Sequence, residues 1–352
     1  MRIIDIARIA GVSIGTVDRV LHNRGHVSEE KRERIEKVLK EINYEPNLVA
    51  RVLASKKTYT FAALVPSYPQ GSYWDLVCQG INKAFEELKK FNVQIEYIFF
   101  DQHDRNSFCS VKEKLLDQSF DGVVIATLFQ EYVEELSKRL DDKNVPYIYI
   151  DSDIPNQNDL AYFGGDSFAS GQIAAKLLTQ QIGMDADIFF AHIRFRYKEI
   201  SLQMKTREMG FMDYLSKNKY KGKIHHIELN PDNQEISITA LREFLAKNKT
   251  VKGGIVLNSR IYEFIELLDQ IEDSLKENIR LIGHDTIEQS IAALKEGKVM
   301  YLLSQRSGLQ GYDAIKALGN FLLFKQQPDK KNFMPIDILI KENVDYYKNY
   351  IL

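Results

Sequence analysis

Cysteine is scarce in this sequence: of 352 residues, only Cys78 and Cys109 carry a thiol. Two thiols build neither a disulfide framework nor the ligand set of a structural zinc site, and we expect both to be buried apolar side chains. Long hydrophobic runs are missing too, since no window approaches about 18 apolar residues and Arg2, Asp5 and Arg8 interrupt the N-terminal segment. We therefore expect a cytoplasmic protein that does not contact a membrane.

The chain also lacks an excess of charge, because 47 Lys and Arg stand against 49 Asp and Glu, a net charge of −2. Taken whole, this balance is unlike that of a general nucleic-acid binder. The charge is unevenly divided, however. Residues 1–57 hold 12 basic and 8 acidic side chains, a net charge of +4, whereas residues 58–352 hold 35 and 41, a net charge of −6. The asymmetry predicts a polyanion partner for the N-terminal segment alone.

Catalytic motifs are missing from residues 59–352, which contain no G-x-S-x-G, P-loop, H-E-x-x-H or G-x-G-x-x-G pattern. Gly164-Gly165 alone does not form a phosphate-binding loop. His225 and His226 lie on an expected strand, and we interpret them as structural. We expect neither an enzyme nor a metal ion nor a cofactor.

Residues 1–46 have the pattern of a small helical domain. Apolar residues recur with helical spacing in residues 3–10, 14–21 and 35–42. Gly11 can adopt the positive φ that ends a helix, and Ser13 can cap the next one. Two short helices joined by a three-residue turn with glycine are typical of a helix-turn-helix, and the third helix closes its core. Beyond Pro46, residues 48–54 are expected to form one more short helix.

Four stretches carry a more specific signal: DIARIAGVSIGTVDRVL at 5–21, Val27-Ser28, NYEPN at 43–47 and ARVLA at 50–54. They resemble the DNA-binding headpiece of the lactose-repressor (LacI/GalR) family. The resemblance implies a sequence-specific transcriptional regulator, usually a repressor, that binds a pseudo-palindromic operator in double-stranded DNA as a homodimer. It divides this segment into a headpiece at 1–46 and a hinge helix with linker at 47–58. Residues 346–352 show no leucine heptads that would join dimers into tetramers.

The resemblance assigns DNA contacts to the second helix, its flanks and the hinge. Ile14 and Gly15 open the recognition helix, and Arg19 can donate two hydrogen bonds to guanine. Leu53 matches the leucine that the family inserts into the minor groove. The complete expected set is Ser13, Ile14, Gly15, Thr16, Asp18, Arg19, His22, Asn23, Ala50, Leu53 and Ala54.

From residue 59 the pattern changes to buried strands alternating with amphipathic helices, which predicts α/β lobes with doubly wound parallel sheets. Strands are expected at 60–65, 93–100, 122–125 and 147–150, and a second series at 187–191, 224–228, 254–257 and 280–283. Ligands of such sheets bind beyond the carboxyl ends of the strands.

The markers of this second part are FGGDSFASG at 163–171, REMGF at 207–211, Gly283-His284-Asp285 and Leu303-Ser304-Gln305. They are similar to the sugar-binding domain that the family shares with type I periplasmic binding proteins. The resemblance implies that a small sugar-like effector between two lobes controls operator affinity. We expect the effector-binding domain at 59–352, with the first lobe at about 59–164 and 306–326 and the second at about 165–305 and 327–352.

The expected effector site lies at the strand ends. Tyr73 and Trp74 offer flat rings for the apolar face of a sugar, while carboxylate, amide and guanidinium groups suit its hydroxyls. The candidate ligand-binding residues are Tyr73, Trp74, Asp151, Ser152, Arg194, Arg207, Asn258, Arg260, Asp285 and Gln305.

The charge of the effector stays open at this stage. Arg194 and Arg260 follow strands of the second lobe, and Arg306 follows Gln305. If two of these arginines point into the cleft, an acidic or phosphorylated sugar is expected, because Arg pairs with carboxylate and phosphate. If they are exposed to solvent, a neutral sugar is expected. A stand-alone sugar-binding transport protein is the alternative function, but it has no use for residues 1–55, and an α/β enzyme is the next.

One residue departs from the family pattern. Asp18 stands where the family usually has serine, and phosphates repel a carboxylate unless it accepts a hydrogen bond from a cytosine amine. Alternatively, Asp18 orients a neighbouring basic side chain. We predict that Asp18→Ser relaxes operator choice and raises affinity for non-specific DNA. Titrations of the wild type and the variant with operator and with random duplex DNA measure both effects, and unchanged affinities in both would contradict the role given to Asp18.

Overall fold

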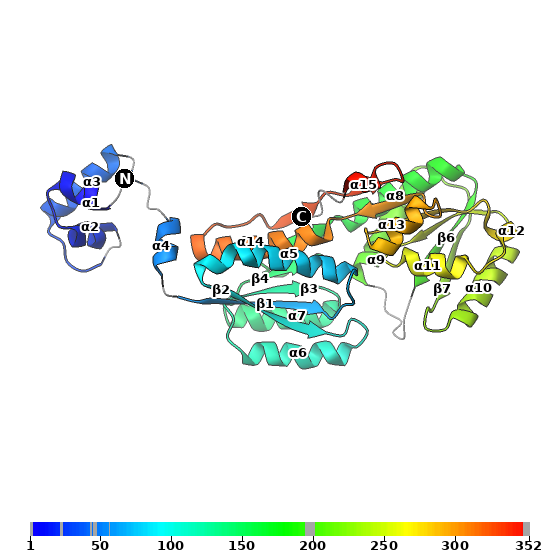
Figure 1. Cartoon of the computed structure of the whole chain (residues 1–352), viewed down its shortest axis with the longest axis horizontal. Helices are drawn as coiled ribbons and strands as arrows, with labels where there is room; N and C mark the ends of the chain where they lie inside the picture. Colours follow the sequence, from blue (N-terminus) through cyan, green and yellow to red (C-terminus); the bar gives the residue numbers. More distant parts are fainter. Residues whose placement is uncertain are drawn as a thin grey trace. The chain divides into compact units, whose positions relative to one another are not determined.

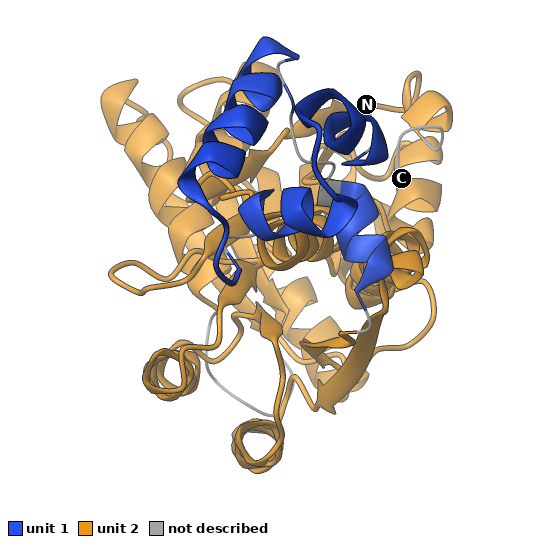
Figure 2. Cartoon of the chain, turned by 90° about the vertical axis from the view of Figure 1, so that its left-hand side faces the viewer, with its two compact units in different colours: residues 1–55 blue, residues 56–352 orange. Residues whose placement is uncertain are grey.

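The computed structural model describes residues 3–21, 24–42, 44, 48–55, 57–193 and 201–347. The chain forms two compact units, Met1–Ser55 and Lys56–Leu352, which are coloured separately in Figure 2. None of the helices within the described ranges has the length and apolar character needed to cross a membrane. Cys78 is buried as expected, whereas Cys109 is only half-buried.

The first unit contains helices α1 (Ile3–Ala10), α2 (Ile14–Leu21), α3 (Glu29–Glu41) and α4 (Leu48–Ala54). Gly11 has the expected left-handed backbone, with φ +65°, and the Ser13 hydroxyl accepts a hydrogen bond from the Thr16 amide at 3.2 Å. The helix-turn-helix and its third helix share one core, which consists of Ile6, Ala7, Ala10, Val17, Val20, Ile35 and Val38.

The second unit contains two lobes, each with a sheet of six strands in the described residues. The first sheet has the order β11-β5-β4-β3-β1-β2 and the second has the order β12-β10-β9-β8-β6-β7. Each lobe therefore repeats the other strand for strand, and the predicted fold class is confirmed. The strands of the first sheet are β1 (Tyr59–Pro66), β2 (Val93–Phe100), β3 (Gly122–Ala126), β4 (Tyr147–Ile150), β5 (Ala161–Gly165) and β11 (Lys331–Met334). Those of the second are β6 (Asp187–Ile193), β7 (Ile224–Leu229), β8 (Val251–Val256), β9 (Arg280–His284), β10 (Tyr301–Ser304) and β12 (Asp337–Leu339).

Helices cover both faces of each sheet (Figure 1). In the first lobe, α5 (Tyr73–Leu88) and α14 (Ser307–Phe324) lie on one face, while α6 (Arg105–Asp117) and α7 (Gln130–Asp142) lie on the other. In the second lobe, α8 (Ser167–Ile182) and α9 (Leu202–Lys217) share one core. The opposite core contains α10 (Gln234–Lys247), α11 (Ile261–Leu268), α13 (Glu288–Lys295) and α15 (Val344–Tyr347). The short η1 (Lys89–Phe91) and α12 (Asp273–Lys276) complete the list.

One expected boundary is wrong. Residues 327–352 were expected to belong to the second lobe, but β11 pairs in parallel with β5 in the first sheet, from Lys331↔Tyr162 to Met334↔Gly165. An unpaired edge of β5 offers free backbone hydrogen-bonding groups, and residues 331–334 pair with it before the chain crosses to the second lobe. The last crossing lies between Met334 and Asp337, where β12 begins to pair with β10 in antiparallel fashion.

Glycines let one pair of helices approach closely in each lobe. A Cβ on Gly80 of α5 would lie 1.8 Å from the Gly308 carbonyl oxygen of α14, and a Cβ on Gly171 of α8 would lie 1.9 Å from the Arg207 carbonyl oxygen of α9. Both contacts involve rigid backbone rather than a movable side chain. The first contact sets where the first turn of α14 lies, and the second sets how closely α8 and α9 pack. Both α14 and α8 begin directly after a crossing between lobes.

We predict that Gly80→Ala destabilises the second unit by about 1–3 kcal/mol, because α5 and α14 must move apart. Urea unfolding should show a lower midpoint than in the wild type. Gln79→Ala, on the exposed side of the same turn, is the matched control and should change stability by less than about 0.5 kcal/mol. Equal midpoints for wild type and Gly80→Ala would show that the helix contact is not tight.

Candidate functional site

The predicted DNA-contacting residues lie on the solvent side of two helices. Ser13, Ile14, Gly15 and Arg19 are exposed, and Thr16 and Asp18 are half-buried. In α4, which contains Ala50, Leu53 and Ala54, these three positions are exposed and Leu53 keeps 53% of its surface. His22 and Asn23 lie outside the described residues. The DNA contacts themselves stay predictions.

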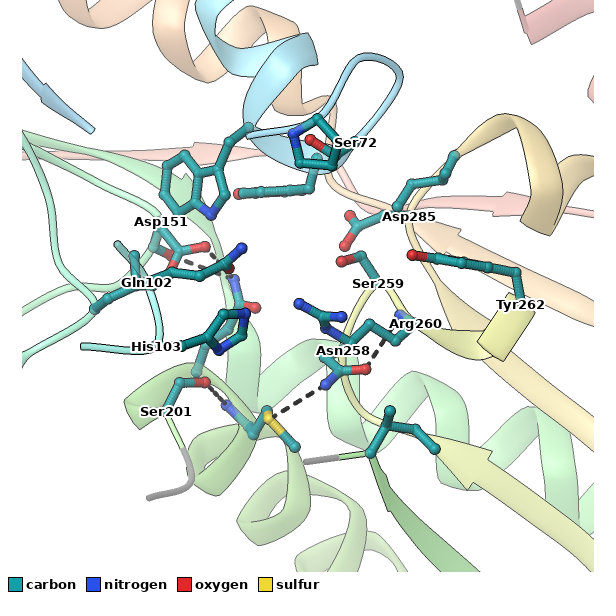
Figure 3. Close-up of a pocket in the computed structure, with 18 of the residues that line it drawn as sticks. Ser72, Gln102, His103, Asp151, Ser201, Asn258, Ser259, Arg260, Tyr262 and Asp285 are labelled. Carbon is teal, nitrogen blue, oxygen red and sulfur yellow. Dashed lines mark hydrogen bonds between the residues drawn. The ribbon is translucent and has the colours of Figure 1, made fainter. Parts of the chain in front are cut away.

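A cavity of ≈ 260 Å³ lies between the two lobes at the carboxyl ends of the strands. The first lobe contributes the segments that follow β1, β2, β3 and β4, and the second contributes the end of β6, the start of α9 and the segments that follow β8 and β9. In Figure 3, Gln102, His103 and Asp151 face Asn258, Ser259 and Arg260 across this space.

Two carboxylates occupy equivalent positions in the lobes. Asp151 follows β4 and Asp285 follows β9, which are the fourth strands of their lobes in chain order. Both have a left-handed backbone, with φ 81° and φ 65°, which aspartate tolerates better than most residues. They are 7% and 2% exposed and both line the cavity.

Burial makes these carboxyl groups hard to ionise. It raises the pKa of Asp285 to about 6, against the opposing effect of the Arg207 charge. Burial also raises the pKa of Asp151, which Arg207 again opposes. Arg207 is 2% exposed, and its Nη1 donates to the Leu257 carbonyl at 2.6 Å. One buried cation is thus placed where it interacts with both carboxylates.

Amide side chains connect the two carboxylates. Gln203 Nε2 donates to Asp151 Oδ1 at 3.1 Å and lies 3.3 Å from Gln305 Oε1. Gln305 Nε2 in turn donates to Asp285 Oδ1 at 3.2 Å. Gln203 lies in the first turn of α9, in the second lobe, and Gln305 directly follows β10, where the chain crosses back to the first lobe. This line of hydrogen bonds therefore links the two lobes at a crossing.

An aromatic pair forms part of the cavity wall at the start of α5. Tyr73 and Trp74 pack edge to face, with ring centroids 5.0 Å apart, and are 7% and 6% exposed. The Tyr73 hydroxyl donates to Gln310 Oε1 at 3.3 Å. The ring faces are therefore held in place before a ligand arrives.

The structure brings most of the predicted ligand residues together. The ones that line the cavity are Tyr73, Trp74, Asp151, Asn258, Arg260 and Asp285. Ser152, Arg207 and Gln305 lie behind it: the Ser152 hydroxyl donates to Asp151 Oδ2 at 3.1 Å, and the other two hold the carboxylates as described above. Arg194 lies outside the described residues.

Arg306 does not belong to this cavity. Its Nε and Nη2 donate to the two oxygens of Asp337, at 2.8 Å and 3.1 Å. Arg260 does line the cavity, but its Nη1 is bound to Glu263 at 2.7 Å. Arg306 is therefore next to Gln305 in the sequence but does not line the effector cavity.

Sequence reasoning missed several cavity residues: Gln102, His103, Arg105, Phe129, Ser201, Gln203 and Tyr262. Gln102 and His103 lie within three residues of the end of the expected strand 93–100, so the strand-end rule could have found them. His103 has its pKa lowered by burial and by the charge of Arg260, which belongs to the opposite lobe. The neutral imidazole is therefore favoured in this arrangement of the lobes.

Comparison with known proteins identifies the two parts of the chain. Residues 2–47 match the model of the bacterial regulatory proteins of the lacI family, and residues 61–326 match the model of a periplasmic binding protein domain. The chain belongs to the LacI family of bacterial regulatory proteins. It is a DNA-binding transcriptional regulator, and the expectation from the headpiece motifs is confirmed.

Three similar proteins match between 42% and 83% of this regulator. A ribose operon repressor from Lactococcus lactis subsp. lactis is 25% identical over 292 residues, 81% of each chain. Catabolite control protein A from Staphylococcus aureus is 30% identical over 146 residues, 42% of each chain. The crystal structure of a putative LacI transcriptional regulator from Bacteroides fragilis superposes with a TM-score of 0.77 at 35% identity, over 83% of this chain and all of that one.

We predict that Asp285→Asn stabilises the unliganded regulator by about 2 kcal/mol at pH 7.5, because the folded chain holds an ionised carboxylate that prefers its proton. The raised pKa, about 6 against 3.8 in an unfolded chain, makes the wild type lose stability as pH rises from about 4 to 6. The gap between variant and wild type in urea unfolding should therefore shrink between pH 7.5 and pH 5.

The exposed Glu277→Gln provides the control and should leave the unfolding midpoint unchanged at both values of pH. A stability gap for Asp285→Asn that is the same at pH 5 and pH 7.5 would contradict a proton-linked origin.

Proposed function

We propose that this regulator binds a neutral monosaccharide in the cavity between its lobes, and that the bound sugar changes its affinity, as a homodimer, for operator DNA. The buried pair Asp151 and Asp285 is the observation that carries the proposal. An ionised carboxylate accepts hydrogen bonds from two neighbouring hydroxyl groups, and such charge-assisted bonds are stronger than neutral ones.

The charges at the cavity favour a neutral ligand. Arg105, Arg207 and Arg260 lie at or behind its wall, and Asp151, Asp285 and Glu263 lie at or behind it too. Three cations thus balance three carboxylates in charge, and an anionic effector would make the net charge of the site negative. Of the arginines that were considered for an acidic effector, Arg306 is bound to Asp337 and Arg260 to Glu263.

The size and the wall of the cavity favour a single sugar ring. Its volume of ≈ 260 Å³ is below the range of about 300–1,000 Å³ that is typical of sites for drug-sized ligands. Tyr73 and Trp74 supply the flat apolar surface on which the CH groups of a sugar ring pack. The similarity to a ribose operon repressor supports a small aldose as the effector.

The coupling to DNA follows from the crossings between lobes. A sugar that draws Asp151 and Asp285 together moves the first lobe relative to the second and so shifts the surface on which two copies pair. We infer that this shift decides whether two α4 segments come together on the operator. The two α2 helices of a dimer would then read half-sites about one turn of DNA apart.

Trp74 gives a direct test, because it is the single tryptophan of the chain and lines the cavity. We predict a saturable change in its fluorescence with one member of a panel of D-ribose, D-xylose, D-glucose and D-galactose, and no such change with ribose 5-phosphate. Asp151→Asn and Asp285→Asn should each weaken binding at least about tenfold, because each removes a charge-assisted hydrogen bond.

Glu277→Gln is again the matched control and should bind the sugar as the wild type does. A saturable response to the phosphate ester with none to the neutral sugars would contradict a neutral effector. Unchanged affinity in both aspartate variants would remove the carboxylate pair from the binding site.

A further inference from the structure

Two histidines and a glutamate meet on one face of the second lobe, away from the line of carboxylates and amides. His192 lies on β6, His226 on β7 and Glu208 on α9. The strands pair in parallel with Phe190↔His226 and His192↔Glu228, so that the two imidazoles lie on the same face of the sheet, one register step apart. Helix α9 covers this face, where Phe211 packs against Phe190 with ring centroids 5.0 Å apart.

The nitrogen and oxygen atoms of these three side chains lie close together. His192 Nε2 lies 3.1 Å from His226 Nδ1, and His226 Nδ1 lies 3.9 Å from Glu208 Oε1. All the potential ligand atoms lie within 4.8 Å of one another. The two rings have nearly parallel planes, at 4°, with centroids 5.4 Å apart, so one nitrogen donates to the other head to head.

We propose that His192, His226 and Glu208 bind one divalent transition-metal ion of the zinc class. Zn–N bonds of about 2.0–2.1 Å at a tetrahedral centre place two ligand nitrogens about 3.3 Å apart, close to the observed separation of the two imidazoles. The metal ion takes the place of the proton in the hydrogen bond between His192 Nε2 and His226 Nδ1. His226, whose side chain is 47% exposed, then carries its proton on Nε2 and leaves Nδ1 for the ion.

The ligand set and its burial select the kind of ion. Two imidazoles with one carboxylate suit zinc, cobalt, nickel or copper, whereas magnesium and calcium prefer oxygen ligands. His192 is 3% exposed and anchors the site, while Glu208 at 26% and His226 at 47% leave an open side through which the ion enters and where water completes the coordination. Glu228, the register partner of His192, adds a second carboxylate to the same face.

A metal ion here would join α9 to β6 and β7. It would therefore stabilise the second lobe independently of any sugar, and the proposal does not rest on the nature of the effector. The neighbours in sequence of two ligands, Ile193 and Arg207, contribute to the cavity wall and to the carboxylate site, so the metal would also restrain the base of the effector site.

The test uses the full-length, tag-free chain after removal of metal by a chelator and dialysis. Titration with ZnCl₂ should show one saturable site per chain by calorimetry, together with an upward shift of the thermal midpoint. CoCl₂ should give the visible absorption of a four-coordinate ion. His226→Ala should weaken zinc binding at least about tenfold and abolish the cobalt spectrum, while Glu208→Gln should weaken binding to a lesser degree.

His225→Ala is the matched control, because His225 is the next residue of β7 and faces the other side of the sheet, against Phe244 and near Asp187. It should bind zinc with wild-type affinity. Unfolding of both variants without metal establishes that each is folded. Absence of saturable zinc binding in the wild type, equal affinity in His226→Ala and wild type, or equal losses in His225→Ala and His226→Ala would each overturn the proposal.

Discussion

The effector site of this regulator depends on the burial of two carboxylates around one guanidinium. Asp151 and Asp285 are held in left-handed backbone at equivalent strand ends, and Arg207 lies behind them. An isolated buried charge is strongly unfavourable, so the arrangement exists only because Arg207 and the amides of Gln203 and Gln305 compensate the two acids in part. The compensation is incomplete, because the pKa of both aspartates stays raised. Hydrogen bonds from sugar hydroxyls would stabilise the two carboxylates further.

The repetition of the lobes explains why these groups converge. Both sheets have the same strand order, so the ends of β4 and β9 face each other once the chain has crossed between lobes. The close glycine contacts are repeated as well, at Gly80 in the first lobe and Gly171 in the second, and each involves a helix, α14 or α8, that begins directly after a crossing. Two rigid lobes with charged side chains between them can move as bodies, and a small ligand that binds these side chains can shift the equilibrium between their relative positions.

Local patterns in the sequence predicted the elements well and their long-range relations less well. The turn of the helix-turn-helix follows from Gly11 and Ser13, and the strand-end rule together with the family resemblance located Asp151 and Asp285. By contrast, the pairing of β11 with β5 joins residues far apart in the chain, and no local pattern at 331–334 indicates it. Gln203 lies in the first turn of a helix rather than after a strand. His192 and His226 meet only because β6 and β7 are neighbours, so the sequence did not single out His192, and His226 was interpreted, with His225, as structural.

The central claim is that the sugar site and the DNA site are energetically linked. The most direct measurement is the dissociation constant for an operator, selected from random duplexes, at increasing concentrations of the sugar that changes Trp74 fluorescence. Linkage requires that the sugar alter operator affinity by the same factor by which operator alters sugar affinity. The account predicts equal factors in the wild type. It also predicts, at the same sugar concentrations, a smaller change of operator affinity in Asp285→Asn, which binds the sugar more weakly. Operator affinity that stays constant while the wild-type cavity becomes saturated with sugar would contradict it.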